Sequence, residues 1–286
     1  MYVPPAPPGA GTVHGQAPFV GQLSADGAWR WDGVTWAPWT AHRTFRSAHG
    51  RALAAAGLLS VWLVAAVVLV IAEFGRLTLT NRILSGDLPT RAEATDSDNL
   101  VRSATYIGLL VLIVAAVFFL LWLHRIVANN HALGAKQLRF TPGWAVGWWF
   151  VPVANWARPV QAVNEAWRAA DPAVVDSTAD TRRLPASGSH GLIAAWWTTW
   201  ILSSFTIFIG VSAGTGTQNT VSALHDSTIA MLVSQVVRII GCVLAIVLVA
   251  LLTGRQDRKA GAAPSTLGAM PPPAVAYPPP LPPAVI

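Results

Sequence analysis

Four apolar runs constrain this chain more than any other feature of its sequence. They cover residues 52–72, 104–123, 192–211 and 229–252, and only the last contains a charged residue, Arg238. A helix of about 20 residues is long enough to cross the roughly 30 Å of hydrocarbon in a bilayer. The runs therefore predict an all-α integral membrane protein with four transmembrane helices.

The overall composition supports this assignment. Hydrophobic residues make up 53% of the chain and charged residues 11%, whereas soluble domains carry about 25% charged residues. The formal net charge of +6 does not indicate a nucleic-acid partner, because the basic residues flank the apolar runs as topology determinants do. The single cysteine, Cys242, lies within an apolar run, which excludes a disulfide framework.

The distribution of basic residues predicts the orientation of the helices. Basic residues outnumber acidic ones before the first run, between the second and third runs, and after the fourth run. Loops with a basic surplus stay on the cytoplasmic side of a membrane. The pattern predicts a multi-pass protein of the cell (plasma) membrane with both termini in the cytoplasm. The excess of Arg over Lys, seventeen to two, favours a bacterial source and hence the bacterial inner membrane.

Both ends of the chain are rich in proline and carry few charges. Residues 1–22 combine Pro, Gly and Ala, and residues 260–286 end in a series of prolines. Such segments cannot bury an apolar core, so we predict that both are disordered. The C-terminal tail favours a polyproline conformation and is a candidate peptide ligand for a partner protein.

A short Trp-rich motif at residues 23–40 follows the N-terminal tail. Asp32 and Gly33 form a tight-turn dipeptide with Trp residues on both sides, which predicts a small β-hairpin. The motif is either a ribbon that packs on itself or anchors at the interface, or a module that binds a proline-rich peptide. In the second case the candidate peptide-binding residues are Trp29, Trp31 and Trp36.

Residues 142–170, between the second and third runs, are too apolar for a simple loop. Thr141 and Pro142 are typical of a helix start. The stretch from Trp144 to Val153 is apolar, but as a helix of about 15 Å it would cross only half of a bilayer. We therefore predict a helical hairpin on the cytoplasmic side that either re-enters the membrane or lies in its interface.

The second half of this segment is predicted to be an amphipathic helix. Asn155 is a suitable N-cap, and Glu165 and Arg168 fall on the face opposite the apolar residues. With polar neighbours they form either a site for a lipid headgroup or small anion, or a set of structural contacts for the broken backbone. The members of this polar cluster are Arg125, Asn129, Asn155, Arg158, Glu165 and Arg168.

Two polar residues, Gln235 and Arg238, interrupt the last apolar run. Ionisable residues within membrane segments usually serve a function. An arginine near the end of a membrane helix can also extend its head group to the interface. Gln235 and Arg238 are therefore candidate functional residues within the membrane.

The centre of the chain resembles a known family. The motifs that carry this likeness are FLLWLHR at residues 119–125, TPGWAVGWWFVPVAN at residues 141–155, RPVQ at residues 158–161 and E-x-W-R-A-x-D-P at residues 165–172. Together they look like the actinobacterial domain-of-unknown-function 4328 family of multi-pass membrane proteins, over residues 50–255. The pattern W-x-W-D-G-x-x-W at residues 29–36 is similar to domain-of-unknown-function 2510 modules. The resemblance implies the architecture and adds no activity.

No motif indicates an enzyme. The sequence lacks the patterns typical of zinc proteases, serine hydrolases and P-loop nucleotide-binding proteins, and we expect neither a cofactor nor a metal site. We predict a non-enzymatic scaffold or sensor in the lipid bilayer, whose Trp-rich motif and proline-rich tails recruit protein partners. The alternative is a small transporter or channel that uses the broken segment 144–159 and Arg238.

Overall fold

The computed structural model describes residues 29–31, 36–38, 45–133, 135, 138–171, 190–214 and 220–262. The chain divides into two units, Met1–Thr44 and Phe45–Ile286, and we describe each by itself. The predicted disordered segments, residues 1–22 and the tail beyond residue 262, lie outside the described residues.

The first unit contains a pair of short strands, β1 (Trp29–Trp31) and β2 (Trp36–Pro38). They pair antiparallel, with Trp31 opposite Trp36 and Trp29 opposite Pro38. A hairpin over the whole of residues 23–40 stays a prediction. The other residues of the predicted 23–40 motif, and the side chains that would form its peptide-binding surface, lie outside the described residues.

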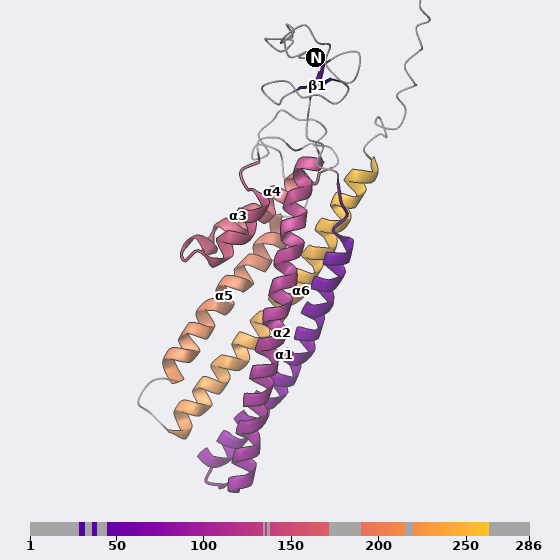
Figure 1. Ribbon diagram of the computed structural model, residues 1–286. Coiled ribbons are helices and arrows are strands. Elements are labelled where there is room, and N and C mark those ends of the chain that lie inside the picture. Colours follow the sequence, from indigo (N-terminus) through magenta and orange to yellow (C-terminus); the bar gives the residue numbers. More distant parts are fainter. Residues whose placement is uncertain are drawn as a thin grey trace, which may run out of the picture. The chain divides into compact units, whose positions relative to one another are not determined.

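The second unit, here called the membrane unit, is built from helices (Figure 1). Its long helices are α1 (His49–Leu84), α2 (Arg91–Ala132), α5 (His190–Gly214) and α6 (Val221–Ala262). Its short ones are α3 (Pro142–Gly147), the 3₁₀ turns η1 (Trp148–Phe150) and η2 (Ala154–Trp156), and α4 (Arg158–Ala169). The four long helices run side by side, and α3 and α4 lie at one end of the unit, here called the α4 end.

Three helices among the described residues are long and apolar enough to cross a membrane: His49–Leu84, Arg91–Asn130 and Val221–Gly261. They contain the first, second and fourth apolar runs, and they suggest a multi-pass membrane protein. The run at 192–211 falls within α5, whose side chains are described only in part, and its role as a fourth span stays a prediction.

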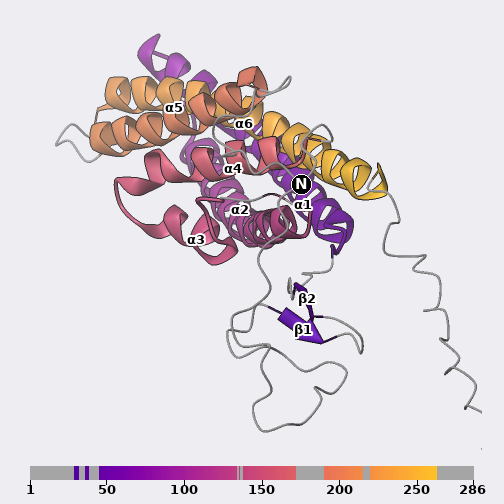
Figure 2. The same ribbon diagram turned by 90° about the horizontal axis from the view of Figure 1, so that it is seen from above.

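The packing order of the long helices follows from their buried faces. Helix α1 buries small and large apolar residues three or four positions apart, which places them in one stripe; they are Ala52, Ala55, Leu59, Trp62 and Ala66. Helix α1 packs on both α2 and α6, and α6 also packs on α5. Helices α2 and α5 are therefore the outer pair, and α4 contacts both of them at its end of the unit (Figure 2).

Helices α1 and α2 both extend beyond their apolar runs and form a hairpin at the end opposite α4. Gly86 adopts φ = 92° in the turn, a conformation that glycine permits. Helix α2 begins at Arg91 because Thr90 and Glu93 cap it reciprocally, with Thr90 N donating to Glu93 Oε2 at 2.7 Å and Glu93 N to Thr90 Oγ1 at 3.2 Å. Arg76 of α1 forms an ion pair with Asp98 of α2, with Nη2 3.1 Å from Oδ1, and this pair joins the two helices.

Helices α5 and α6 approach closely at Gly241. A Cβ at this position would lie 2.8 Å from Thr199 Oγ1 and 3.3 Å from Thr199 Cβ. Gly241 and Ala245 are four residues apart, the small-residue spacing that lets membrane helices pack tightly. The close contact between α5 and α6 at this point therefore requires a residue without a side chain at position 241.

Gly241→Val should lower the free energy of unfolding by about 2 kcal/mol, because overpacking forces the two helices apart. Thermal unfolding in detergent measures the effect. Gly57→Val is the matched control, since a Cβ at Gly57 meets no atom within 4 Å. Thr199→Ala should restore part of the lost stability. Equal losses in both glycine variants would contradict the close approach.

Candidate functional site

A buried polar network joins the long helices at the α4 end. Asn129 Nδ2 donates to Arg46 O at 3.0 Å and to Gln256 Oε1 at 3.2 Å. Gln256 Nε2 donates in turn to Ile126 O at 2.8 Å and to Asn130 Oδ1 at 3.0 Å. The network ties α2 to α6 and to the residues that precede α1. Of these residues, Asn129 is a member of the predicted polar cluster.

Further polar contacts join α6 to α2 and to the end of α4. Trp122 Nε1 donates to Thr253 Oγ1 at 2.9 Å, and Lys259 Nζ to Ala169 O at 2.7 Å. Sequence patterns alone did not identify Thr253, Gln256 and Lys259 as members of a site. A signal for them was present, because they continue the buried stripe of α6; its members are Ala245, Leu248, Val249, Leu252, Thr253, Gln256 and Lys259.

Glu165 holds the connection between α2 and α3. Its carboxylate accepts hydrogen bonds from Arg139 N at 3.0 Å and Phe140 N at 3.1 Å. The side chain is buried in α4 beside Val163 and Trp167. Its predicted place on the polar face of this helix is therefore wrong, because two backbone donors draw the carboxylate inwards and satisfy its charge.

The apolar stretch from Trp144 to Val153 does not form one continuous helix. Thr141 Oγ1 accepts from Trp144 N at 3.4 Å and Pro142 opens α3, which confirms the predicted helix start. The chain then passes through η1 and a turn in which Val153 adopts φ = 65° and ψ = −47°. This conformation is rare for a β-branched residue, and it marks the sharp break between the two halves of the segment.

Asn155 does not cap α4. The N-cap of that helix is Ala157, whereas Asn155 lies within η2. Its Oδ1 atom is buried and has no hydrogen-bond partner in the described part of the chain. The predicted cap is wrong because the 3₁₀ turn of η2 begins before Asn155 and places it two residues short of the cap position.

The segment from η1 to η2 packs against residues inside the apolar runs. The Trp149 ring lies 5.8 Å from the ring of Phe119, between centroids, and the Trp156 ring lies 5.1 Å from that of Phe205. Trp197 Nε1 also donates to Trp156 O at 3.1 Å. Phe119 and Trp197 lie near the ends of their apolar runs, and the choice between a re-entrant segment and one in the interface stays a prediction.

The remaining members of the predicted polar cluster lie apart from this network. Arg158 stacks on the Trp148 ring, with Cζ 5.5 Å from the ring centroid, and its Nη1 donates to Gln161 Oε1 at 3.4 Å. Arg125 and Arg168 are half-buried on α2 and α4. The structure thus distributes the cluster over several structural contacts, and its binding of a headgroup or anion stays a prediction.

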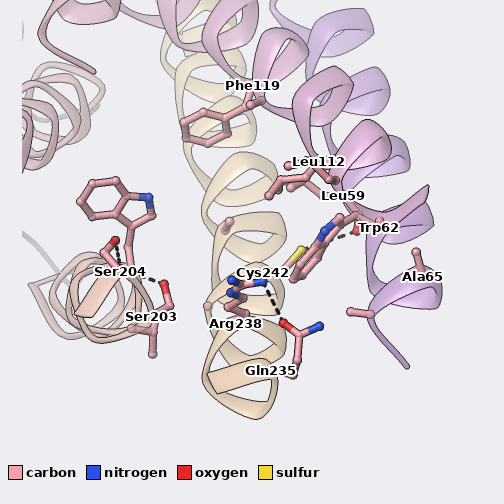
Figure 3. Close-up of a pocket in the computed structure, with 18 of the residues that line it drawn as sticks. Leu59, Trp62, Ala65, Leu112, Phe119, Ser203, Ser204, Gln235, Arg238 and Cys242 are labelled. Carbon is pink, nitrogen blue, oxygen red and sulfur yellow. Dashed lines mark hydrogen bonds between the residues drawn. The ribbon is translucent and has the colours of Figure 1, made fainter. Parts of the chain in front are cut away.

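A cleft of about 530 Å³ lies among the long helices. Helices α1, α2, α5 and α6 all contribute to its wall, and Trp149 of η1 contributes from the broken segment 144–159. Figure 3 shows Arg238 of α6 between Ser203 of α5 and Trp62 of α1. The cleft therefore brings together the two features that the sequence singled out separately, the broken segment and the polar residues of the last run.

The wall of the cleft is apolar apart from a few groups. Arg238 Nη1 donates to Gln235 Oε1 at 2.9 Å, and Gln235 is only 4% exposed. The hydroxyls of Ser203 and Ser204 donate to Trp200 O at 2.8 and 2.9 Å. Arg238 is the only formally charged residue among the described residues that line the cleft. Its head group is turned towards Gln235.

Metal binding finds no support in the described ranges. In residues 45–130, 132–133, 138–171, 191–205 and 220–261, no three His, Cys, Asp or Glu side chains gather closely enough to hold a metal ion. The described lining of the cleft offers apolar contact, hydrogen bonding and one positive charge.

Comparison with known proteins gives one match. The family model described as Domain of unknown function (DUF4328) matches residues 86–254, which is more than half of the chain. The chain belongs to the DUF4328 family. The DUF4328 region begins after α1 and includes α3, α4, α5 and the cleft-lining part of α6, so it is shorter at its start than the resemblance over residues 50–255. No curated protein and no solved structure matches the chain significantly.

Proposed function

We propose that this protein is a non-enzymatic membrane sensor that takes up a membrane-dissolved amphiphile in its cleft. The observation that carries the proposal is the cleft itself, an apolar space of about 530 Å³ among four helices, three of which are long and apolar enough to span a membrane. Spaces of this size, lined by apolar side chains and a few polar groups, are typical of small-molecule sites. The ligand would enter from the hydrocarbon phase.

In this proposal α5 is the fourth span and both termini are cytoplasmic. The basic surplus of the three segments assigned to the cytoplasm supports this orientation, and it makes the α4 end the cytoplasmic end. The Trp-rich motif and the proline-rich tail would then act from the same side as the broken segment 144–159. Their role is to recruit protein partners, which makes the protein a scaffold as well as a sensor.

Gly108→Leu tests the proposal by filling the cleft. Gly108 lines the cleft, and a Cβ there meets no atom within 4 Å, so the leucine should occupy ligand space without displacing the helices. Gly57→Leu is the matched control, because Gly57 is also unobstructed and lies outside the cleft lining. Native mass spectrometry of the full chain, released from its own membranes in mild detergent, reports the bound lipids.

We expect wild type and Gly57→Leu to retain the same bound amphiphile, and Gly108→Leu to lose it. A lipid retained equally by all three proteins, or by none, would contradict the proposed function. The control separates loss of ligand space from a general effect of leucine in a membrane helix.

A second candidate function, a small transporter or channel, has one observation in its favour. Trp149 of the broken segment and Arg238 line the same cleft, and broken helices line binding sites in many transporters. The largely apolar wall argues against passage of a polar solute. Reconstituted vesicles that show Arg238-dependent flux of a polar solute would favour this alternative over the sensor.

A further inference from the structure

Arg238 carries a charge that the described part of the cleft does not neutralise. A guanidinium has five N–H donors, and among the described residues the structure gives Arg238 one hydrogen bond, to the neutral amide of Gln235. No Asp or Glu is present among the described lining residues. Charged groups within the hydrocarbon region pair with an opposite charge wherever one is available. The cleft therefore offers a position for an anion.

The end of the cleft away from Arg238 is aromatic and apolar. Phe119, Trp149 and Trp196 meet there, with the Trp149 ring 5.8 Å from Phe119 and 6.3 Å from Trp196 between centroids. On α2 the lining extends from Thr105 to Phe119, which corresponds to about 21 Å of helix. The space is thus elongated, with the cation part of the way along and an aromatic end towards the broken segment 144–159.

We propose that the ligand of the cleft is a single-chain amphiphile with an acidic head group, whose head pairs with Arg238 and whose chain lies against the aromatic end. This inference rests on the proposed function and specifies its ligand class. A phosphate or carboxylate accepts paired hydrogen bonds from a guanidinium and supplies the negative charge that the described wall lacks. The length and the aromatic end of the cleft suit an extended hydrocarbon chain better than a compact solute.

Two photoreactive probes test the acidic head group directly. One is hexadecyl phosphate with a diazirine near the end of its chain, and the other is hexadecanol with the same diazirine. The full chain is reconstituted in phosphatidylcholine vesicles, and mass spectrometry maps the labelled residues. We expect the phosphate probe to label the cleft helices about tenfold more than the alcohol at equal concentration, as a charge-assisted hydrogen bond implies.

Two variants assign the preference to its residue. Arg238→Gln should remove the preference for phosphate and leave labelling by the alcohol unchanged. Arg238→Lys should keep a smaller preference, because an ammonium group carries the charge but lacks the planar fork. The wild-type comparison of the two probes decides the acidic-head claim even where a variant fails to fold.

The outcomes separate this inference from the proposed function. Equal labelling of the wild-type cleft by both probes overturns the inference and leaves the sensor proposal standing. A phosphate preference that persists in Arg238→Gln overturns the assignment to Arg238. If neither probe labels the cleft helices, the proposed function and the inference are both overturned.

Discussion

Gln256→Leu should lower the free energy of unfolding of the membrane unit by about 3 kcal/mol, because buried polar groups are left without partners. Gln256 is 1% exposed. It donates to Ile126 O and Asn130 Oδ1 and accepts from Asn129. Leucine is close to glutamine in size, so the loss reflects unpaired polar atoms rather than a cavity. Denaturant titration in mixed detergent micelles, followed by tryptophan fluorescence, measures the change.

Two controls define this result. Arg258→Leu alters an exposed side chain on the same turn of α6 and should change the stability by less than about 0.5 kcal/mol. Asn130→Leu combined with Gln256→Leu should cost less than the sum of the single substitutions, because replacing both partners leaves neither end of their shared hydrogen bond unpaired. Additive losses of unfolding free energy would show that the two side chains do not interact. That result would contradict the hydrogen bond between them.

Glu165→Ala should lower the stability by about 3 kcal/mol, because it leaves two backbone N–H groups without their charged acceptor. The donors are Arg139 N and Phe140 N, and they hold the chain where it enters α3. We therefore expect the region from residue 138 to residue 156 to lose protection from hydrogen exchange before the long helices do. Exchange measured by mass spectrometry resolves the two regions.

Glu165→Gln is the informative comparison for this site. Glutamine keeps one acceptor oxygen and a similar shape, so it should recover about half of the stability lost by alanine. A uniform loss of exchange protection over all helices in Glu165→Ala would contradict a local role for the carboxylate, and so would equal effects of the two variants.

The helical core of the fold could be predicted from the sequence, and the helix ends could not. The runs at 52–72, 104–123 and 229–252 lie within the candidate spans because a predominantly apolar segment of this length satisfies its backbone in lipid only as a helix. The extensions of α1 and α2 depend on ion pairs such as Arg76 with Asp98. These pairs form only once the two helices lie side by side, which hydropathy does not specify.

The candidate site was predicted in its parts and not in its assembly. Sequence patterns identified Gln235, Arg238 and the broken segment, yet the cleft that joins them depends on how α1, α2, α5 and α6 pack. Asn129 was identified, whereas its partner Gln256 is 127 residues away. Glu165 was assigned to the polar face because periodicity alone cannot detect backbone donors that approach from another segment.

A density map of the full chain in lipid nanodiscs at side-chain resolution tests the central claim most directly. We expect elongated density inside the cleft, extending from the guanidinium of Arg238 towards Trp149, in the wild-type protein and in Gly57→Leu. The same density should be absent from Gly108→Leu. A wild-type map in which side chains of the long helices close this space, with no density between them, would contradict the account of the protein as a membrane sensor.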